Sequence, residues 1–163
     1  MGRHSATVCF ASGLGALEVE AAESGVTRVR IGGRGKPREV GEGRALALAQ
    51  QTAQEIAGYL AGKRRSFTVP VAADGTAFQK AVWAELSKIP YGTKRTYGEL
   101  AATLGRPRGA RAIGAACGAN PVPILVPCHR VVGRDGLLGG FGAGLTVKRK
   151  LLDLEGGSSA IER

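Results

Sequence analysis

The sequence predicts an α+β protein in two parts: an antiparallel sheet with a helix over residues 1–75, and a helical part over residues 76–163 that contains a helix-turn-helix. Before residue 32, short stretches that alternate between apolar and polar residues are separated by glycines, which is typical of antiparallel strands. After the turn signal Asp74-Gly75, the apolar spacing is helical and two short helices are predicted in succession. A chain of 163 residues forms one domain or two small ones packed together.

The first part contains three predicted strands and one predicted helix. Gly13, Gly15 and Gly25 mark the turns between strands at residues 7–10, 16–20 and 26–31. Residues 32–43 are rich in glycine and charge, which predicts a loop. A helix is predicted over residues 44–60, with one apolar side formed by Leu46, Ala49, Ala53, Ile56, Ala57 and Leu60.

The remainder of the first part shows no chemical motif. Residues 67–71 fit either one more strand or an extended linker. Cys9 lies in a strand pattern and is interpreted as a small buried hydrophobic residue. We therefore interpret residues 1–75 as a support domain.

The second part begins with an apolar stripe over residues 78–89 that predicts a helix ending at a proline. Thr96 and Glu99 have the spacing of a capping box, in which each side chain caps the other residue's amide. A short helix over residues 97–104 should follow. After a break with glycine and proline, a second helix is predicted over residues 108–117.

This helix pair has the helix-turn-helix pattern, and its second helix has an unusual composition. Arg106, Arg108 and Arg111 cluster at the turn and the start of that helix. Most of its other residues are Gly or Ala, although Gly inside a helix costs about 1 kcal/mol relative to Ala. Either tight packing against a neighbouring element or close approach to a DNA groove explains such small residues.

Charge and composition indicate which class of molecule the protein binds and in which cellular compartment it is expected. Residues 76–163 carry 13 Lys and Arg against 6 Asp and Glu, whereas residues 1–75 carry 10 against 7. This excess favours a polyanion such as nucleic acid, with solvated surface charge as the alternative. The apolar stretches are too short to span a membrane, and three scattered Cys form no disulfide framework. We expect a cytoplasmic protein that makes no membrane contact.

The stretch over residues 120–132 places Cys128 directly before His129, after an apolar run. The chain's other histidine, His4, lies near the N-terminus. A thiol becomes a strong nucleophile only as a thiolate, which a nearby His promotes. Adjacent residues of a strand point to opposite faces. Either the chain turns at this point, or His129 reaches the sulfur through a water molecule.

A third group usually orients such a histidine. The acids downstream are Asp135, Asp153, Glu155 and Glu162, and the sequence does not choose among them, although Glu155 is placed to close a helix. That last helix is predicted to begin at Thr146 and to expose residues 148–150. The glycine-rich run at 139–144 lacks the context of a nucleotide-binding loop.

Other classes of protein fit these residues less well. Cys128 could be a buried structural thiol, but a proline before it and His-Arg after it are unusual for a plain core. A cysteine hydrolase usually takes its His from a distant part of the sequence. A helix-turn-helix transcription factor has no need of the Cys-His pair. Two His and three scattered Cys provide no zinc spacing, so we expect no metal.

Residues 120–132, Asn-Pro-Val-Pro-Ile-Leu-Val-Pro-Cys-His-Arg-Val-Val, closely resemble the active-site signature of the O6-alkylguanine-DNA alkyltransferases. The resemblance covers roughly the last 80 residues, including 89–92, 96–101, 110–114 and 151–155. The first 75 residues match only in general layout, which implies a ribonuclease-H-like domain.

The resemblance implies a stoichiometric DNA-repair reaction. The protein would bind duplex DNA in the minor groove through its helix-turn-helix and flip the damaged guanine out of the stack. Cys128 would accept the alkyl group from O6 of guanine irreversibly, so each molecule acts once. The same resemblance admits O4 of thymine as a second target. It implies no cofactor, and we expect a monomer.

The resemblance also implies roles for individual residues. Cys128 is the acceptor, His129 the base acting through a water, and Glu155 the group that polarises it. Asn120 is a hinge between the helix pair and the active-site loop. Tyr97 presses on the target phosphate and helps to protonate the leaving guanine.

Further residues are assigned to DNA and to the alkylguanine pocket. Arg111 is implied to fill the gap left by the flipped base. The other implied contacts with DNA are Arg106, Ala110, Gly114 and Arg134. The residues implied to form the alkylguanine pocket are Pro123, Val131, Phe141, Gly142 and Ala143.

The sequence departs from the family's pattern in that pocket. Phe141 stands where the family often has Tyr, Gly142 aligns with a Ser in some members, and Ala143 replaces a common Gly. We expect the loss of the Tyr hydroxyl to cost little if the ring only stacks on the base. Ala143 is expected to narrow the pocket and to disfavour bulky adducts such as benzyl. Some members carry zinc in the N-terminal domain, but its ligand set is absent from this sequence.

Overall fold

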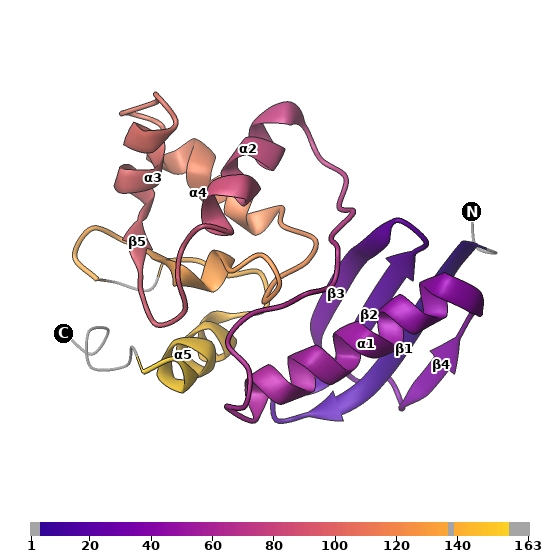
Figure 1. The fold of residues 1–163 in the computed structure, drawn as a ribbon. Helices are drawn as coiled ribbons and strands as arrows, with labels where there is room; N and C mark the ends of the chain where they lie inside the picture. Colours follow the sequence, from indigo (N-terminus) through magenta and orange to yellow (C-terminus); the bar gives the residue numbers. More distant parts are fainter. Residues whose placement is uncertain (1–3, 137–138, 157–163) are drawn as a thin grey trace. The chain divides into compact units, whose positions relative to one another are not determined.

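The structure, a computed structural model, describes residues 4–136 and 139–156. The chain divides into two compact units, Met1–Asp74 and Gly75–Arg163 (Figure 1). The class of the fold is mixed, with an antiparallel sheet and helices, as the sequence predicts. Within the described residues, no helix has the length and apolar character needed to cross a membrane.

The first unit is a four-stranded antiparallel sheet in the order β3-β2-β1-β4, with one helix lying across it (Figure 1). The three expected strands are present, and a fourth lies in the segment predicted as a loop. The strands are β1 (Ser5–Ser12), β2 (Gly15–Ala22), β3 (Gly25–Gly33) and β4 (Arg38–Val40). Because β4 has three exposed residues at the sheet edge, it has no apolar alternation for the sequence pattern to reveal.

Helix α1 (Gly43–Leu60) packs on β1 and β2. Its buried side is rotated from the predicted one, because Ala57 is exposed whereas Tyr59 and Glu55 are buried. The Glu55 carboxylate accepts hydrogen bonds from the backbone N–H and the hydroxyl of Thr68. Residues 67–71 are an extended segment that joins β3 by a single bridge between Val26 and Val71.

The second unit is helical and contains α2 (Ala77–Leu86), α3 (Tyr97–Thr103), α4 (Ala110–Gly118) and α5 (Leu145–Leu154). The predicted capping box starts α3: the Thr96 hydroxyl accepts from the Glu99 amide at 3.0 Å, and Glu99 accepts from the Thr96 amide at 2.7 Å. Helix α2 holds α4 in place, because the Trp83 indole N–H donates to the Ala116 carbonyl at 2.9 Å.

A small parallel sheet leads into the central motif. Strand β5 (Arg95–Thr96) pairs with β6 (Val131–Val132), and neither two-residue strand was predicted. Strands of two residues are too short to show the alternation of apolar and polar residues by which a strand is predicted. Together they place the start of α3 beside the end of the Cys-His motif.

Candidate active site

Cys128, His129 and Arg130 form a single 3₁₀ turn between the apolar run and β6. The chain therefore turns at this point instead of continuing as a strand. All three side chains are buried; Cys128 is 6% exposed and His129 is fully enclosed. The turn begins after Pro127, and the Arg130 amide donates to the Pro127 carbonyl at 3.0 Å.

Asn120 closes the loop that leads to this turn. Its Nδ2 donates to the Val126 carbonyl at 2.9 Å, and its Oδ1 accepts from the Val122 amide at 3.0 Å. Ile124, inside the loop, has the left-handed backbone angle φ of 74°, which is costly for a β-branched residue. Burial raises the pKa of Cys128, and a hydrogen bond from Asn120 opposes that rise. Asn120 thus links the end of α4 to the thiol.

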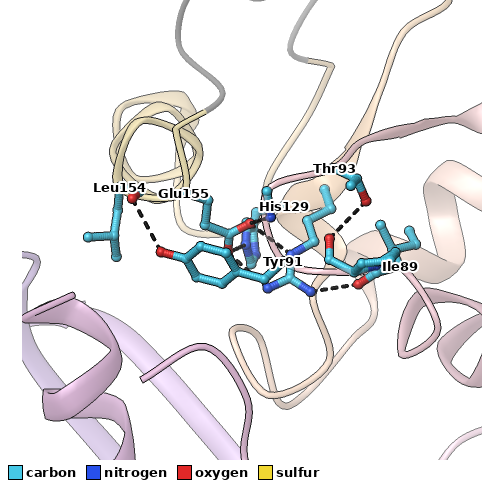
Figure 2. A network of polar contacts seen from close by, with 9 residues as sticks. Ile89, Tyr91, Thr93, His129, Leu154 and Glu155 are labelled. Atoms are coloured by element: carbon cyan, nitrogen blue, oxygen red, sulfur yellow. Dashed lines mark hydrogen bonds and ion pairs between the residues drawn. The ribbon is translucent and has the colours of Figure 1, made fainter. Parts of the chain in front are cut away.

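Glu155 is the acid that orients the histidine. It caps the C-terminal end of α5, and its Oε2 lies 2.8 Å from Nε2 of His129 (Figure 2). Asp135 and Asp153 are exposed, and Glu162 lies outside the described residues. Among the described acids downstream of His129, Glu155 is therefore the one that contacts the imidazole.

Arg130 fixes Glu155 and was not predicted as a site residue. Its Nε donates to Oε1 of Glu155 at 2.9 Å and its Nη2 donates to Oε2 at 3.0 Å. Its Nη1 donates to the Ile89 carbonyl at 2.7 Å. The Gly92 amide adds a hydrogen bond to Glu155 at 3.2 Å. This two-pronged geometry fixes the carboxyl group in front of the imidazole.

Burial lowers the pKa of His129 by more than the neighbouring Glu155 raises it, so the imidazole is neutral at pH 7 and able to accept a proton. Burial also raises the pKa of Cys128, against the opposing effects of Asn120 and Lys148. The resting sulfur is therefore a thiol. Its reaction therefore requires a base that removes the proton before the sulfur attacks.

Lys148 was predicted to be exposed, and that prediction is wrong. Its side chain is fully buried, and Nζ donates to the Val131 carbonyl at 2.6 Å and to the Gly140 carbonyl at 3.3 Å. Burial lowers its pKa to about 8. Helical spacing places Lys148 on the same side of α5 as Leu151 and Leu152, a signal that could have revealed its burial.

A cavity of about 450 Å³ opens beside Cys128, which is within the range of small-ligand sites. One side of α4 and parts of α3 and the glycine-rich loop enclose it. The residues that line it are Tyr97, Ala110, Arg111, Gly114, Cys117, Gly118, Cys128, Gly140 and Phe141.

Tyr97 begins α3 at the wall of this cavity. Burial is the main cause that raises its pKa to about 12, so the phenol keeps its proton and can donate it. Gly139 lies close against the ring: a Cβ there would stand 2.7 Å from the Tyr97 hydroxyl. Only glycine fits at this point of the loop, which also has a positive φ of 67°.

The structure brings some of the predicted pocket and DNA residues together and leaves others apart. Pro123, Val131, Gly142 and Ala143 do not line the cavity in the part of the chain described by the structure, although Phe141 does. The carbonyl of Val131, one of the residues implied to form the alkylguanine pocket, accepts from Lys148. The expected DNA residues outside the cavity are Arg106, whose guanidinium stacks 4.5 Å from the ring of Phe78, and the exposed Arg134.

No metal ligand set is formed within residues 4–136 and 139–156, where no three His, Cys, Asp or Glu side chains gather. The site contains instead a buried thiol, a neutral imidazole held by a fixed carboxylate, and a protonated phenol around an apolar cavity. A buried thiol beside a neutral imidazole is the arrangement found in the class of proteins that use a cysteine nucleophile.

Comparison with known proteins narrows this class. Residues 77–157 match the family described as 6-O-methylguanine DNA methyltransferase, DNA binding domain. The methylated-DNA–protein-cysteine methyltransferase of Methanosarcina acetivorans is 49% identical over 107 residues, which are 66% of this chain and 69% of that relative. The inducible enzyme of Bacillus subtilis is 54% identical over 103 residues, 63% of this chain and 58% of the relative.

The similarity in structure extends over most of the chain. The crystal structure of Mycobacterium tuberculosis O6-methylguanine methyltransferase has a TM-score of 0.80 at 36% identity, covering 96% of this chain and 94% of that one. A structure of Mycobacterium tuberculosis OGT in complex with DNA has a TM-score of 0.80 at 37% identity, covering 94% and 92%. The chain belongs to the methylated-DNA–protein-cysteine methyltransferase family.

Proposed function

We propose that this protein repairs duplex DNA by transferring the alkyl group from O6 of guanine to Cys128 in a single turnover. The observation that carries the proposal is the buried Cys128 at the wall of an apolar cavity, next to the His129–Glu155 pair. The named relatives are methylated-DNA–protein-cysteine methyltransferases, and one similar protein is bound to DNA. O4 of thymine is a second target of the same chemistry.

The proton of Cys128 leaves first. Glu155 lies at Nε2 of His129, so Nδ1 is the ring nitrogen that receives the proton. A water molecule carries the proton from the sulfur to Nδ1. The neutral state of His129 and its contact with the fixed Glu155 side chain fit this direction of transfer. The thiolate, formed near the ammonium of Lys148, then attacks the alkyl carbon in line with the bond to O6.

As the sulfur–carbon bond forms, the carbon–O6 bond breaks and its electron pair moves into the guanine ring. Tyr97 donates the proton that returns guanine to its neutral form. The raised pKa of Tyr97 keeps its hydroxyl protonated until that step. The thioether product does not release the alkyl group at neutral pH. Each molecule therefore removes one lesion.

The target reaches the cavity by base flipping from the minor groove. We propose that α3 and α4 are a helix-turn-helix whose second helix lies against DNA, because α4 presents small residues and Arg111 at the cavity. Arg111 then fills the gap in the stack, and Asn120 is the hinge to the active-site loop. We propose that the first unit is a support domain of the ribonuclease-H-like type.

Within this scheme the proposed base contacts are the backbone of Val131 and Gly142, with Pro123 and Phe141 against the ring. Phe141 at the cavity wall supports the last of these. A carbonyl has two lone pairs, so the Val131 oxygen can accept from Lys148 and from a guanine amine together. Ala143 is proposed to narrow the space available to large adducts, and an Ala143→Gly variant that reacts no faster with benzylguanine would contradict this.

A single-turnover titration tests the proposed function. Duplex DNA with one O6-methylguanine is mixed with protein at a series of ratios, and restored guanine is quantified by nucleoside chromatography. The expected result is a plateau at one guanine per protein molecule. Continued turnover beyond that plateau, or no restored guanine at any ratio, would contradict the proposal.

A further inference from the structure

A second thiol lines the same cavity. Cys117 belongs to α4, is half-buried, and shares the cavity wall with Cys128. Both thiols act electrostatically on Tyr97 and on Lys148, which places them around the same two groups. Nothing in the proposed reaction uses Cys117.

Cys117 is unsuited to be a second acceptor. Burial is the main cause that raises its pKa to about 12, and the neighbouring Cys128 acts in the same direction. The hydrogen bond from Asn120 favours the thiolate of Cys128, whereas Lys148 is the one influence that lowers the pKa of Cys117. A neutral thiol is a weak nucleophile, so Cys117 acts through its volume and apolar surface.

The side of α4 that faces the cavity explains why that volume matters. Gly114 and Gly118 have no side chain, and Ala110 has only a methyl group. Arg111, which is exposed, and Cys117 are thus the α4 side chains at the cavity that extend beyond Cβ. In an in-line transfer, the alkyl group lies between O6 and the acceptor sulfur, against whatever wall stands beside that sulfur.

We infer that Cys117 is a specificity-determining residue that limits the size of the alkyl group accepted on O6 of guanine. The inference rests on the proposed function. The sulfur of Cys117 occupies part of the space that a large substituent needs and leaves room for a methyl group. Removing or enlarging this side chain changes the reaction of bulky adducts more than that of small ones.

The test compares second-order rates for duplexes that carry O6-methylguanine or O6-benzylguanine. Wild type, Cys117→Ala, Cys117→Leu and the nearly isosteric Cys117→Ser are measured with both. The benzyl-to-methyl rate ratio is expected to rise by roughly tenfold in the Ala variant and to fall by a similar factor in the Leu variant. The Ser variant keeps the wild-type ratio. Cys9→Ala, which removes a buried thiol of the first unit, serves as the matched control.

The outcomes separate the inference from the function on which it rests. An unchanged ratio in the Ala variant, with normal thermal unfolding and alkylation of Cys128, overturns the inference alone. Alkylation found on Cys117 in wild type also overturns it. If wild type alkylates Cys128 with neither substrate, the proposed function fails and the inference fails with it. If the Leu variant does not fold, the Ala and Ser variants still decide the question.

Discussion

At the scale of single residues, the site separates proton removal from nucleophilic attack. Burial favours the thiol of Cys128, and burial also favours the neutral imidazole that receives its proton. Arg130 holds Glu155 with two hydrogen bonds, so the carboxylate is fixed before the imidazole becomes charged. This preorganisation lowers the cost of forming the imidazolium during the reaction.

Glu155→Gln tests this relay. The amide keeps the size of the side chain but removes its charge, so it stabilises the imidazolium poorly and the alkyl-transfer rate should fall roughly 10²-fold. Rapid-quench kinetics with O6-methylguanine DNA measure the rate. Asp153→Asn, an exposed acid on the same helix, is the control and should react normally. Equal rates for the Gln variant and wild type would exclude the relay.

The pH dependence of the rate tests Lys148. His129 has a lowered pKa, so its base form persists below pH 6.5 and the rate should stay high there. Lys148 carries its charge below a pKa of about 8 and loses it above, so the rate should decline as pH rises through 8. Lys148→Met should react slowly and show no such decline. Lys150→Met, exposed on the same helix, should keep the wild-type profile, and a decline retained in the Lys148 variant would refute the assignment.

At the scale of elements, α4 combines small residues, among them Gly114 and Gly118, with a position at the cavity. A Cβ added at Gly114 would meet only the Tyr97 ring, at 3.9 Å, which is an ordinary contact. Packing within the protein therefore does not demand glycine at this position. Of the two explanations that the sequence left open for the small residues, the space at Gly114 favours close approach of DNA or of the flipped base.

Gly114→Ala separates the two explanations. The variant should be more stable, with a free energy of unfolding about 0.5–1 kcal/mol higher than that of wild type, because alanine is the better helix former. Its alkyl transfer should nonetheless slow, because the methyl group enters the cavity. Chemical denaturation and single-turnover kinetics measure the two effects. Gly58→Ala, inside α1 with space for a Cβ, should gain stability at an unchanged rate. Faster or equal transfer by the Gly114 variant would favour the packing explanation.

An element was predictable from sequence where its end carries a recognisable capping pattern. Thr96 and Glu99 have capping side chains, and the start of α3 was confirmed. Strand β4 and the β5–β6 pair are too short to show a period, so they were missed. Lys148 was misassigned because a positive charge is rarely buried, whereas here two carbonyl oxygens accept from it. Arg130 and Cys117 became site residues only through contacts between segments far apart in the sequence.

At the scale of the whole molecule, positive charge is concentrated in residues 76–163, which contain the cavity and α4. The polyanion that the composition favours would then bind the same unit that carries Cys128. Binding of phosphates releases counterions from DNA, so affinity is expected to fall steeply with salt. Little preference for base sequence is expected, because the minor groove presents a degenerate pattern.

Arg108→Ala tests where the phosphate contacts lie. Arg108 is exposed just before α4, so its loss should weaken DNA binding and reduce the slope of log affinity against log salt by about one unit. Fluorescence anisotropy with undamaged duplex measures the slope. Arg28→Ala, an exposed arginine on β3 of the first unit, should leave it unchanged. The opposite ranking of the two variants would place DNA on the first unit.

The central claim is that Cys128 itself accepts the alkyl group. The most direct measurement incubates the protein with duplex DNA containing O6-methylguanine, takes the intact mass, and locates the added mass by peptide fragmentation. We expect the mass to increase by one methylene on Cys128, with none on Cys9 or Cys117 and none in a Cys128→Ser variant. A protein that binds the damaged duplex but gains no mass, or that carries the methyl group on another residue, would contradict the account.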